Sequence, residues 1–431
     1  MNIRLLLFGM LLILTSLTAE AQLADTLKFM SYNLLNYRNT TNQCTNVTNN
    51  SSDKEAALRT LFLYYKPDVL VCQEISASPQ NSYAFIQDNV LNVNGETAYR
   101  SANFSNNSFS SLVNMLYYDS EKVGLLRQEA VTRDLSNQFL VRVIDIYHMY
   151  YKDPNLTAGS DTVFFTVVAA HLKAGNSSSD AADRAAATNA LMQYLSNNAI
   201  RGNVLLAGDL NVYTSGETGF QNLVSYSDQS VRFYDPIDQL GNWNSNSAYR
   251  FYHTQSTRSS NTNGGCFSGG GLDDRFDFIL AQFPVLAPTN DFRYIDNSYR
   301  ALGQDGNDYN QELDVNNNSL PSVIAQTLYD ISDHLPVKME VEVDKLIGTS
   351  AAAAHPLRIV HPTWVRHQLT IRHNATGSGQ FVLYSLSGQR LAAISAQPSY
   401  VNMPVPQAAG IYLLTYEVAG HPLYRSKIMV P

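Results

Sequence analysis

The stretch ISDHLPV, residues 331–337, places an Asp-His pair between a polar turn and an apolar strand. Asp333 offers a carboxylate, and His334 offers an imidazole that titrates near neutral pH. Alone the pair has little diagnostic weight, because Asp and its polar neighbours are common in turns that precede strands. Its significance depends on the polar residues that accompany apolar runs elsewhere in the chain.

Five earlier polar clusters lie beside apolar, strand-like runs. They are SYNLLNY with Asn33, VLVCQE with Glu74, VVAAHLK with His171, LLAGDLN with Asp209 and Asn211, and DDRFDFIL with Asp277. Taken singly, each is explained by a turn residue or by a histidine that is satisfied in the core. Together, and in this order, the clusters predict one acidic site formed at the ends of strands.

The residue types in these clusters suit the hydrolysis of a phosphodiester. That reaction needs a hard cation near the phosphoryl oxygens, a base that activates water and a donor for the leaving oxygen. Carboxylate and amide oxygens are the usual ligands of Mg²⁺ and Ca²⁺, and no Cys/His spacing of the zinc type occurs in the sequence. Asp277 can accept the second imidazole proton of His334, which would fix the tautomer of that base.

The central region, about residues 27–343, resembles the endonuclease/exonuclease/phosphatase superfamily with its DNase I-like fold. The motifs SYN, QE, HLK, GDLN, RFDFIL and SDHLPV occur in the order typical of that family. The resemblance implies an α/β (α+β) four-layer sandwich, in which two packed, mixed β-sheets are flanked by helices and the site lies at one edge. It also implies a metal-dependent phosphoric ester hydrolase.

The same resemblance implies a metal site and a base. Glu74 is the expected main ligand of Mg²⁺, with Mn²⁺ or Ca²⁺ as alternatives, and Asn33 and Asp333 are the expected assisting ligands. His334 is the expected general base, and Asp277 is its expected partner.

The resemblance further implies groups that contact substrate. Asp209 and Asn211 are expected to position water, phosphate or the leaving group. His171 is expected to donate a hydrogen bond or a proton to the phosphate or the leaving oxygen. Lys173 and Arg184 are candidate phosphate contacts, although a solvated helix face is the preferred interpretation of Arg184.

The N-terminal segment is typical of a secretory signal peptide. Residues 1–21 contain Arg4, an apolar run from Leu5 to Leu17 and a small-residue Ala-Glu-Ala stretch. No later run approaches the roughly 20 apolar residues that a membrane helix needs. We therefore expect an exported protein with a catalytic domain at 22–345, followed by a low-complexity linker at 346–355.

Residues 356–431 predict a small all-β, Ig-like sandwich, because short alternating segments are separated by Gly, Pro or polar turns. FVLYSLSGQRL, GIYLLTYEV and the final KIMVP resemble the type A sorting domain of the type IX secretion system. That resemblance implies the secretion machinery as a partner and a secreted or cell-surface location in a Gram-negative bacterium. A carbohydrate-binding module, with Trp364 in a sugar platform, is the alternative.

The formal net charge of −8 is unevenly distributed. Residues 346–431 hold six basic side chains and one acidic side chain, and residues 1–21 hold Arg4 and Glu20, so residues 22–345 carry −13. This region lacks the clustered Lys and Arg that tight binding of a nucleic acid duplex needs. It can still hold a divalent cation, and the cation can hold a phosphate.

Three cysteines do not make a disulfide framework. Cys72 lies inside the apolar run VLVCQE, and we expect it to be a buried, unreactive thiol. Cys44 and Cys266 lie in polar loops beyond two of the site clusters. The sequence leaves open whether these two pair in an oxidising compartment or remain thiols.

Helices and long loops separate the strands. Ser52 and Glu55 predict a capped helix start, and an alanine-rich helix is expected over 180–198. Residues 241–272 mix aromatic and Arg side chains with many Asn, Ser and Gly. The sequence therefore favours two interpretations of this loop equally, a flexible insertion and a substrate-binding loop. We expect residues 303–318 to form a loop, with a structural Ca²⁺ site as the alternative, because EF-hand spacing is missing.

The leading functional hypothesis is a secreted, divalent-metal-dependent nuclease that acts on DNA or RNA. A phospholipid or inositol-phosphate diesterase, or a phosphatase of the same fold, is the first alternative. The sequence shows no evident apolar hairpin for membrane docking, which counts against a lipid substrate. A noncatalytic surface-binding protein is the alternative from another class, and oligomeric state is left open.

Overall fold

The computed structural model describes residues 24–345, apart from 107–108, 155 and 157–161, and residues 359–430, apart from 362–364, 366–367, 374–378, 397–398 and 419–420. The predicted signal peptide and linker lie outside these ranges. The chain divides after residue 346 into two compact units. Each unit is described by itself.

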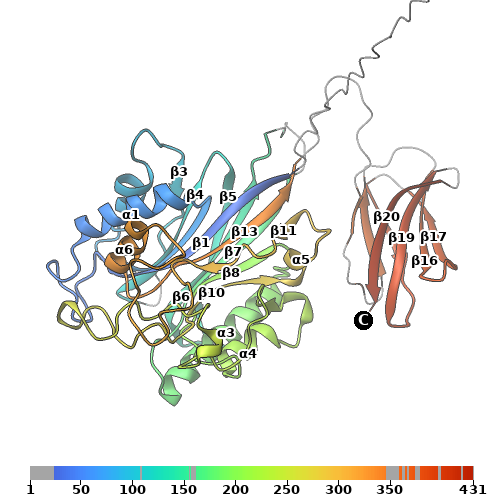
Figure 1. Cartoon of the computed structure of the whole chain (residues 1–431). Helices are drawn as coiled ribbons and strands as arrows, with labels where there is room; N and C mark the ends of the chain where they lie inside the picture. Colours follow the sequence, from blue (N-terminus) through green and yellow to red (C-terminus); the bar gives the residue numbers. More distant parts are fainter. Residues whose placement is uncertain are drawn as a thin grey trace, which may run out of the picture. The chain divides into compact units, whose positions relative to one another are not determined.

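The first unit contains two mixed β-sheets (Figure 1). One sheet has the order β11-β13-β1-β2-β4-β3, with β12 paired to β13, and the other has the order β5-β6-β7-β8-β10-β9. The pairs β1–β2 and β7–β8 are parallel, and the remaining pairs are antiparallel. The first sheet consists of β1 (Ala24–Tyr37), β2 (Val69–Ser76), β3 (Tyr99–Ser101), β4 (Leu112–Asp119), β11 (Phe292–Tyr294), β12 (Arg300–Ala301) and β13 (Val337–Asp344). The second consists of β5 (Val123–Arg133), β6 (Phe139–Tyr151), β7 (Phe164–His171), β8 (Val204–Asp209), β9 (Phe233–Tyr234) and β10 (Asp277–Gln282).

Helices cover the outer faces of both sheets. The apolar faces of α1 (Ser51–Tyr65) and α6 (Ser322–Ile331) pack with side chains of the first sheet, and those of α3 (Ser178–Asn197) and α4 (Thr218–Val224) pack with the second. Short helical turns at α2 (Ala84–Ile86), Gln87–Leu91, Gln229–Val231, Ser247–Tyr249, Asn263–Gly265 and α5 (Phe283–Leu286) lie in the connections. The expected four-layer sandwich of two sheets flanked by helices is confirmed. Among the described residues, no helix has the length and apolarity needed to cross a membrane.

Apolar side chains of both sheets fill the space between them. Phe165 of β7 stacks on Phe292 of β11 with ring centroids 4.9 Å apart, and Phe29 of β1 meets both rings edge-on. Strand β13 reads VKMEVEVD, and its alternate residues are buried in this core, as the two-residue period of a strand requires. Each fully buried apolar side chain stabilises the fold by about 1.5–3 kcal/mol, so the core holds the strand ends in fixed positions.

The helix starts differ in part from the sequence prediction. The start of α1 is capped by Asn50, whose side chain accepts hydrogen bonds from the backbone N–H groups of Ser52 and Asp53. The predicted Ser52–Glu55 cap is wrong, because the Glu55 carboxylate is buried and accepts from Tyr37 and Arg38 instead. The alanine-rich helix is confirmed as α3, which starts two residues and ends one residue earlier than expected.

The second unit consists of two small sheets, with orders β14-β15-β18 and β17-β16-β19-β20. Its strands are β14 (Ile359–Val360), β15 (Gln368–His373), β16 (Gln380–Ser385), β17 (Arg390–Ser395), β18 (Ser399–Pro404), β19 (Gly410–Val418) and β20 (His421–Val430). Leu369 and Ile371 of one sheet share a buried core with Phe381 and Leu414 of the other. The expected all-β unit is therefore present, and Trp364 lies outside the described residues.

Candidate active site

Three strands of the second sheet place their site residues side by side. His171 is the last residue of β7, Asp209 is the last residue of β8, and Asp277 is the first residue of β10. His171 pairs directly with Asp209 in the parallel ladder, and Asp277 pairs with Asp209 in the antiparallel ladder. The three side chains therefore meet at one edge of the sheet.

Asn33 and Glu74 reach the site from irregular positions inside strands of the first sheet. Both β1 and β2 continue beyond them, so the prediction that these residues end strands is wrong. The β1–β2 register shifts between Asn33 and Tyr37, and Glu74 has φ +60°, a left-handed conformation that is uncommon for residues other than glycine. Bulges of this kind re-aim side chains, and here the bulge directs the Glu74 carboxylate toward the second sheet.

The Asn33 side chain connects the two sheets. Its Nδ2 donates to Glu74 Oε1 at 3.1 Å and to Asp209 Oδ2 at 3.0 Å. The second Glu74 oxygen, Oε2, accepts from the backbone N–H of Asn36 at 2.8 Å. Because one amide bonds to two acidic side chains, both carboxylates are held at a fixed separation.

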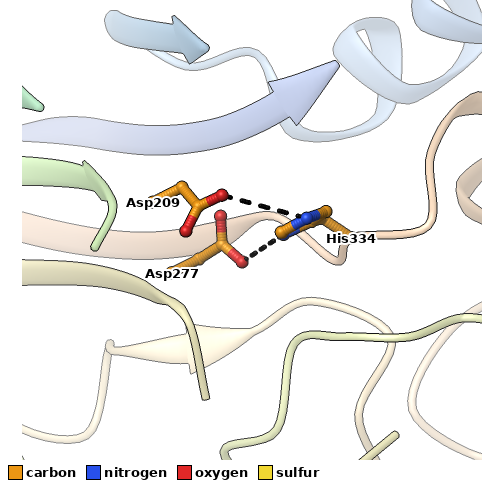
Figure 2. Close-up of side chains that lie close together, drawn as sticks. All are labelled: Asp209, Asp277 and His334. Atoms are coloured by element: carbon orange, nitrogen blue, oxygen red, sulfur yellow. Dashed lines mark hydrogen bonds and ion pairs between the residues drawn. The ribbon is translucent and has the colours of Figure 1, made fainter. Parts of the chain in front are cut away.

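His334 forms a pair with Asp277 (Figure 2). Its Nδ1 lies 2.8 Å from Asp277 Oδ2, and its Nε2 lies 2.7 Å from Nε2 of Gln255 and 3.9 Å from Asp209 Oδ2. Burial by itself would lower the pKa of His334, but the negative charges of Asp277, Asp209 and Asp333 raise it well above its usual value. The carboxylate on Nδ1 fixes the ring so that Nε2 faces the acidic site.

Whereas His334 favours the protonated form, the other histidine of the site, His171, favours the neutral form. Burial, followed by the positive charges of Arg142 and His334, lowers its pKa well below its usual value. Its Nε2 lies 3.5 Å from Asp209 Oδ2 and 3.8 Å from Glu74 Oε1. A neutral imidazole in this position can donate a hydrogen bond from Nε2.

Burial also alters the carboxylates. It raises the pKa of Asp209 to about 7 against the opposing charge of His334, and the negative charges of Asp277 and Glu74 act in the same direction as burial. Burial raises the pKa of Asp333 as well. Asp333 Oδ2 accepts from the backbone N–H of Ser268 at 2.9 Å. Its Oδ1 is buried without a hydrogen-bond partner among the described residues.

These residues fit a hard divalent cation. Four carboxylates gather at the site, and Asp277 Oδ1, like Asp333 Oδ1, has no hydrogen-bond partner among the described residues. Asp209, Asp277 and His334 offer ligand atoms within 4.8 Å of one another. Because Asp277 and His334 already bond to each other, their pair is better suited to proton transfer than to coordination. The ligand set Glu74, Asn33 and Asp333 stays a prediction.

Sequence reasoning missed three polar residues beside the site. Gln255 contacts His334, Arg142 donates to the carbonyl of Leu172 at 2.9 Å, and the buried Lys54 ammonium donates to two carbonyls of β1. Burial lowers the pKa of Lys54 to about 7, although Asp333 and Glu74 oppose that shift. None of the three follows an apolar run in a recognisable motif, so the sequence carried no signal for them.

The long loop 241–272 is packed into the unit. Trp243, His253 and Arg258 are buried, and both ring nitrogens of His253 hydrogen-bond backbone carbonyls. The loop supplies Gln255 to the base and the Ser268 N–H to Asp333. It is therefore part of the framework that positions the site.

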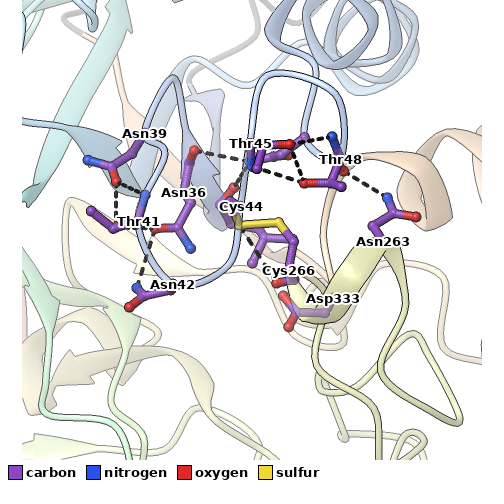
Figure 3. Close-up of a disulfide and its surroundings, with 12 residues drawn as sticks. Asn36, Asn39, Thr41, Asn42, Cys44, Thr45, Thr48, Asn263, Cys266 and Asp333 are labelled. Atoms are coloured by element: carbon purple, nitrogen blue, oxygen red, sulfur yellow. Dashed lines mark hydrogen bonds between the residues drawn. A yellow bond between two sulfur atoms is a disulfide. The ribbon is translucent and has the colours of Figure 1, made fainter.

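Cys44 and Cys266 form a disulfide, which settles the alternative that the sequence left open (Figure 3). The bond packs in a small buried cluster with Leu35 and Phe267. It joins two segments that each supply one backbone N–H to a site carboxylate, from Asn36 to Glu74 and from Ser268 to Asp333. Cys72 is a buried free thiol, as expected.

The remaining candidates, Asn211 and Lys173, contact or belong to the loop that follows β7. Asn211 donates from Nδ2 to the carbonyl of Leu172 at 3.2 Å, and its backbone N–H donates to Asp209 Oδ1. Lys173 is partly exposed and pairs with Asp180 at 2.6 Å.

Arg184 is buried and pairs with Glu217, so its interpretation as part of a solvated helix face is wrong. Its Nη1 donates to the carbonyls of Lys173 and Gly175, which makes it a support of the loop after β7. In the acidic segment 303–318, Asp305 and Asp308 accept backbone N–H groups within the segment, as in an ordinary loop.

A scan against protein-family models found no match, and a search of curated proteins found none either. Among solved structures, the chain is similar to the human Nocturnin catalytic domain with bound sulfate anion, at 14% identity and a TM-score of 0.46, covering 74% of this chain and 97% of that one. It is also similar to an endonuclease/exonuclease/phosphatase family protein from Bacteroides thetaiotaomicron, at 13% identity and a TM-score of 0.45, covering 74% and 99%. A third similar structure is D. rerio TDP2 complexed with single strand DNA product, at 14% identity and a TM-score of 0.45, covering 73% and 98%.

Proposed function

We propose that the first unit is a divalent-metal-dependent phosphodiester hydrolase and that its substrate is nucleic acid. The observation that carries this proposal is the placement of the Asp277–His334 pair beside three further carboxylates and a neutral histidine. A general base, a cation-binding oxygen cluster and a hydrogen-bond donor are the three parts that hydrolysis of a phosphodiester requires.

The proton-transfer roles follow from the hydrogen bonds. Asp277 accepts the Nδ1 proton of His334, so Nε2 is the atom that takes a proton from the attacking water. Gln255 lies against the same nitrogen and orients the ring. His171, neutral and buried, donates from Nε2 to a phosphoryl or leaving oxygen, and Asp209 and Asn211 position the reacting groups.

Glu74, Asn33 and Asp333 are the residues that would hold Mg²⁺, with Mn²⁺ or Ca²⁺ as alternatives. A bound divalent cation would supply positive charge to the phosphoryl oxygens and would offset the carboxylates that raise the pKa of His334. Asn33 fixes the Glu74 carboxylate, and the Ser268 N–H fixes that of Asp333. Asp333 Oδ1, which has no hydrogen-bond partner in the part of the chain that the structure describes, supports this assignment.

We also propose that the protein is exported and secreted. The features that support this are the signal-peptide pattern of residues 1–21 and the resemblance of residues 356–431 to a type IX sorting domain. The disulfide between Cys44 and Cys266 is compatible with an oxidising compartment.

The experiment that tests the proposed function is nicking of supercoiled plasmid and degradation of oligonucleotides by the purified protein with Mg²⁺, with Ca²⁺ and with chelator. Glu74→Ala and His334→Ala should each abolish the metal-dependent cleavage. Glu121→Gln, at an exposed acid on the surface, is the matched control and should cleave like the wild type. Equal cleavage by all four proteins would refute the site, and no cleavage by a folded wild-type protein would refute the nuclease.

A further inference from the structure

Two phenylalanines and an arginine form an exposed group near the candidate active site. Phe109, in the segment before β4, is 83% exposed, and Phe139, the first residue of β6, is 45% exposed. Their ring centroids lie 5.5 Å apart in an edge-to-face arrangement. The Arg133 guanidinium lies 3.7 Å from the centroid of Phe139. Phe109, Arg133 and Phe139 are called the aromatic platform below.

The aromatic platform is held by hydrogen bonds of its own segments. Arg133 Nη1 donates to the carbonyl of Asn137 at 2.7 Å across the β5–β6 turn. Asn106 Nδ2 donates to the carbonyl of Ser110, the residue after Phe109, at 2.6 Å. Phe109 and Phe139 expose adjoining apolar rings to water, and an exposed apolar surface of this kind points to a ligand.

Both sides of the aromatic platform are joined to strands of the active site. Phe139 lies three residues before Arg142, and Arg142 donates to the carbonyl of Leu172, next to His171. On the other side, Phe109 lies two residues before Ser111, whose carbonyl accepts from the N–H of Ala77, three residues after Glu74. The platform is therefore connected, through β6 and through the Ala77–Ser111 hydrogen bond, to the part of the site that contains Glu74 and His171.

We propose that the aromatic platform binds an unpaired nucleobase of the substrate, next to the scissile phosphodiester. The inference rests on the proposed function and narrows its substrate class to single-stranded nucleic acid. A nucleic acid carries a flat aromatic base beside each phosphodiester, so one molecule can satisfy both the platform and the carboxylate site. Aromatic faces stack on any base, and an arginine adds a cation–π contribution. A base inside a duplex has both faces covered and cannot stack on Phe109.

The same hairpin argues against insertion into a membrane. Its turn, residues 134–138, reads DLSNQ, and the Asp134 carboxylate accepts the backbone N–H groups of Ser136 and Gln138. Leu135 and Val141 are also exposed on this hairpin, which the sequence interpretation did not identify. Insertion of the tip into lipid would bury the Asp134 carboxylate, and that cost disfavours a lipid occupant.

The test compares Phe109→Ala with the wild-type protein on two substrates. One is a short single-stranded oligonucleotide, and the other is an oligonucleotide of the same length in which every base is replaced by an abasic site, so that it carries phosphodiesters without an aromatic ring. Phe109→Ala should lower kcat/KM for the oligonucleotide by about tenfold, the loss expected for one stacked base. It should leave kcat/KM for the abasic oligonucleotide within about twofold, and Phe109→Trp should restore cleavage of the oligonucleotide that carries bases. Phe283→Ala, at an exposed ring on α5, is the matched control.

The outcomes separate this inference from the proposed function. Unchanged oligonucleotide cleavage by Phe109→Ala overturns the aromatic platform and leaves the hydrolase intact. If the wild-type protein cleaves neither substrate, the proposed function fails, and fluorescence anisotropy of the labelled oligonucleotide then tests the platform alone. If oligonucleotide binding does not depend on Phe109, the aromatic platform is overturned. Binding to phosphatidylcholine/phosphatidylglycerol vesicles that requires Phe109, with no effect on the oligonucleotide, would assign the surface to membrane instead.

Discussion

Glu74 combines an unusual backbone conformation with two fixed hydrogen bonds. A residue other than glycine at φ +60° in a strand costs of order 1–3 kcal/mol, and such strain gathers at functional sites. The Asn33 amide and the Asn36 N–H each hold one oxygen of the carboxylate. Because the fold tolerates this backbone strain, we infer that the position of the Glu74 carboxylate is important to the site.

Replacement of Glu74 by Gln should remove metal binding while the fold persists. The amide keeps the shape of the side chain but loses the negative charge, so affinity for Mg²⁺ should fall by at least about a hundredfold. Titration calorimetry measures the affinity, and thermal unfolding in chelator should give a melting temperature equal to or above that of the wild type. Tight Mg²⁺ binding by Glu74→Gln would show that the cation is held elsewhere.

Asp277 should control the charge of its histidine partner. Asp277→Asn removes the nearest negative charge, so the pKa of His334 should fall, and kcat should fall by about a thousandfold or more because the tautomer is no longer fixed. NMR titration of the histidine side chains measures the pKa. An unchanged His334 titration in a folded Asp277→Asn protein would contradict the pairing.

Asp145 should make stability depend on pH. Burial raises the pKa of this carboxyl from 3.8 to about 7, while Ser105 and Asn114 hydrogen bonds oppose the shift. The folded state therefore retains a proton that the unfolded chain has lost between about pH 4 and pH 7. The free energy of unfolding should decrease as pH rises through this window, by between about 1 and about 4 kcal/mol.

The Asp145→Asn side chain does not titrate, so a comparison with the wild type isolates the pH dependence that comes from the Asp145 carboxyl. Its free energy of unfolding relative to the wild type should increase between pH 5 and pH 8, measured by urea denaturation at both values. A difference that stays constant with pH would contradict the raised pKa of Asp145.

At the scale of elements, the disulfide fastens two loops that hold the site carboxylates. Without the Cys44–Cys266 bond, the Asn36 and Ser268 N–H groups are no longer linked through one buried cluster. The Cys44→Ser/Cys266→Ser double variant should lose about 2–4 kcal/mol of stability and bind Mg²⁺ several-fold more weakly. Denaturation and calorimetry measure the two effects.

Reductant provides the control for this prediction. It should shift the wild-type protein toward the behaviour of the double variant and should leave the double variant unchanged, because Cys72 is a buried thiol. Weaker stability with unaltered Mg²⁺ affinity would show that the disulfide supports the fold without positioning the carboxylates.

The elements also show which parts of the site a sequence can reveal. His171 and Asp209 end long apolar runs, and Asp277 opens one, so the runs themselves predicted their positions. The conformation of Glu74 arises from a register shift between strands, which the local pattern does not encode. Gln255 reaches His334 only because a loop of 32 residues, 241–272, packs back on the site. Such contacts depend on the tertiary arrangement, as does the pairing of Cys44 with Cys266.

At the scale of the whole molecule, the charge of −13 on residues 22–345 predicts an unusual response to salt. Proteins that hold nucleic acid through many Lys and Arg side chains lose affinity steeply as salt rises. In the proposed function a divalent cation and the aromatic platform take the place of these basic side chains, and salt screens the repulsion between protein and substrate. Between about 50 and 200 mM NaCl, kcat/KM for a single-stranded oligonucleotide should change by less than about threefold. A loss of about a hundredfold or more would reveal an undetected basic surface.

The four-layer architecture followed from the order of strand-like runs and from the family resemblance, and the two-sheet core confirms it. The secretory role of the second unit stays a prediction. A fusion of residues 356–431 to a reporter tests it, since the reporter should reach the medium only in cells with the type IX machinery.

The disulfide also determines what a single proteolytic cut does to the protein. The two cysteines are separated by 222 positions in the sequence, so the bond encloses α1 and every strand from β2 to β9 in one covalent loop. The exposed turn at 134–138 lies inside that loop. A cut there would yield two fragments on a reducing gel and one band without reductant, and the strands that carry Glu74 and His171 would stay attached to the rest of the site.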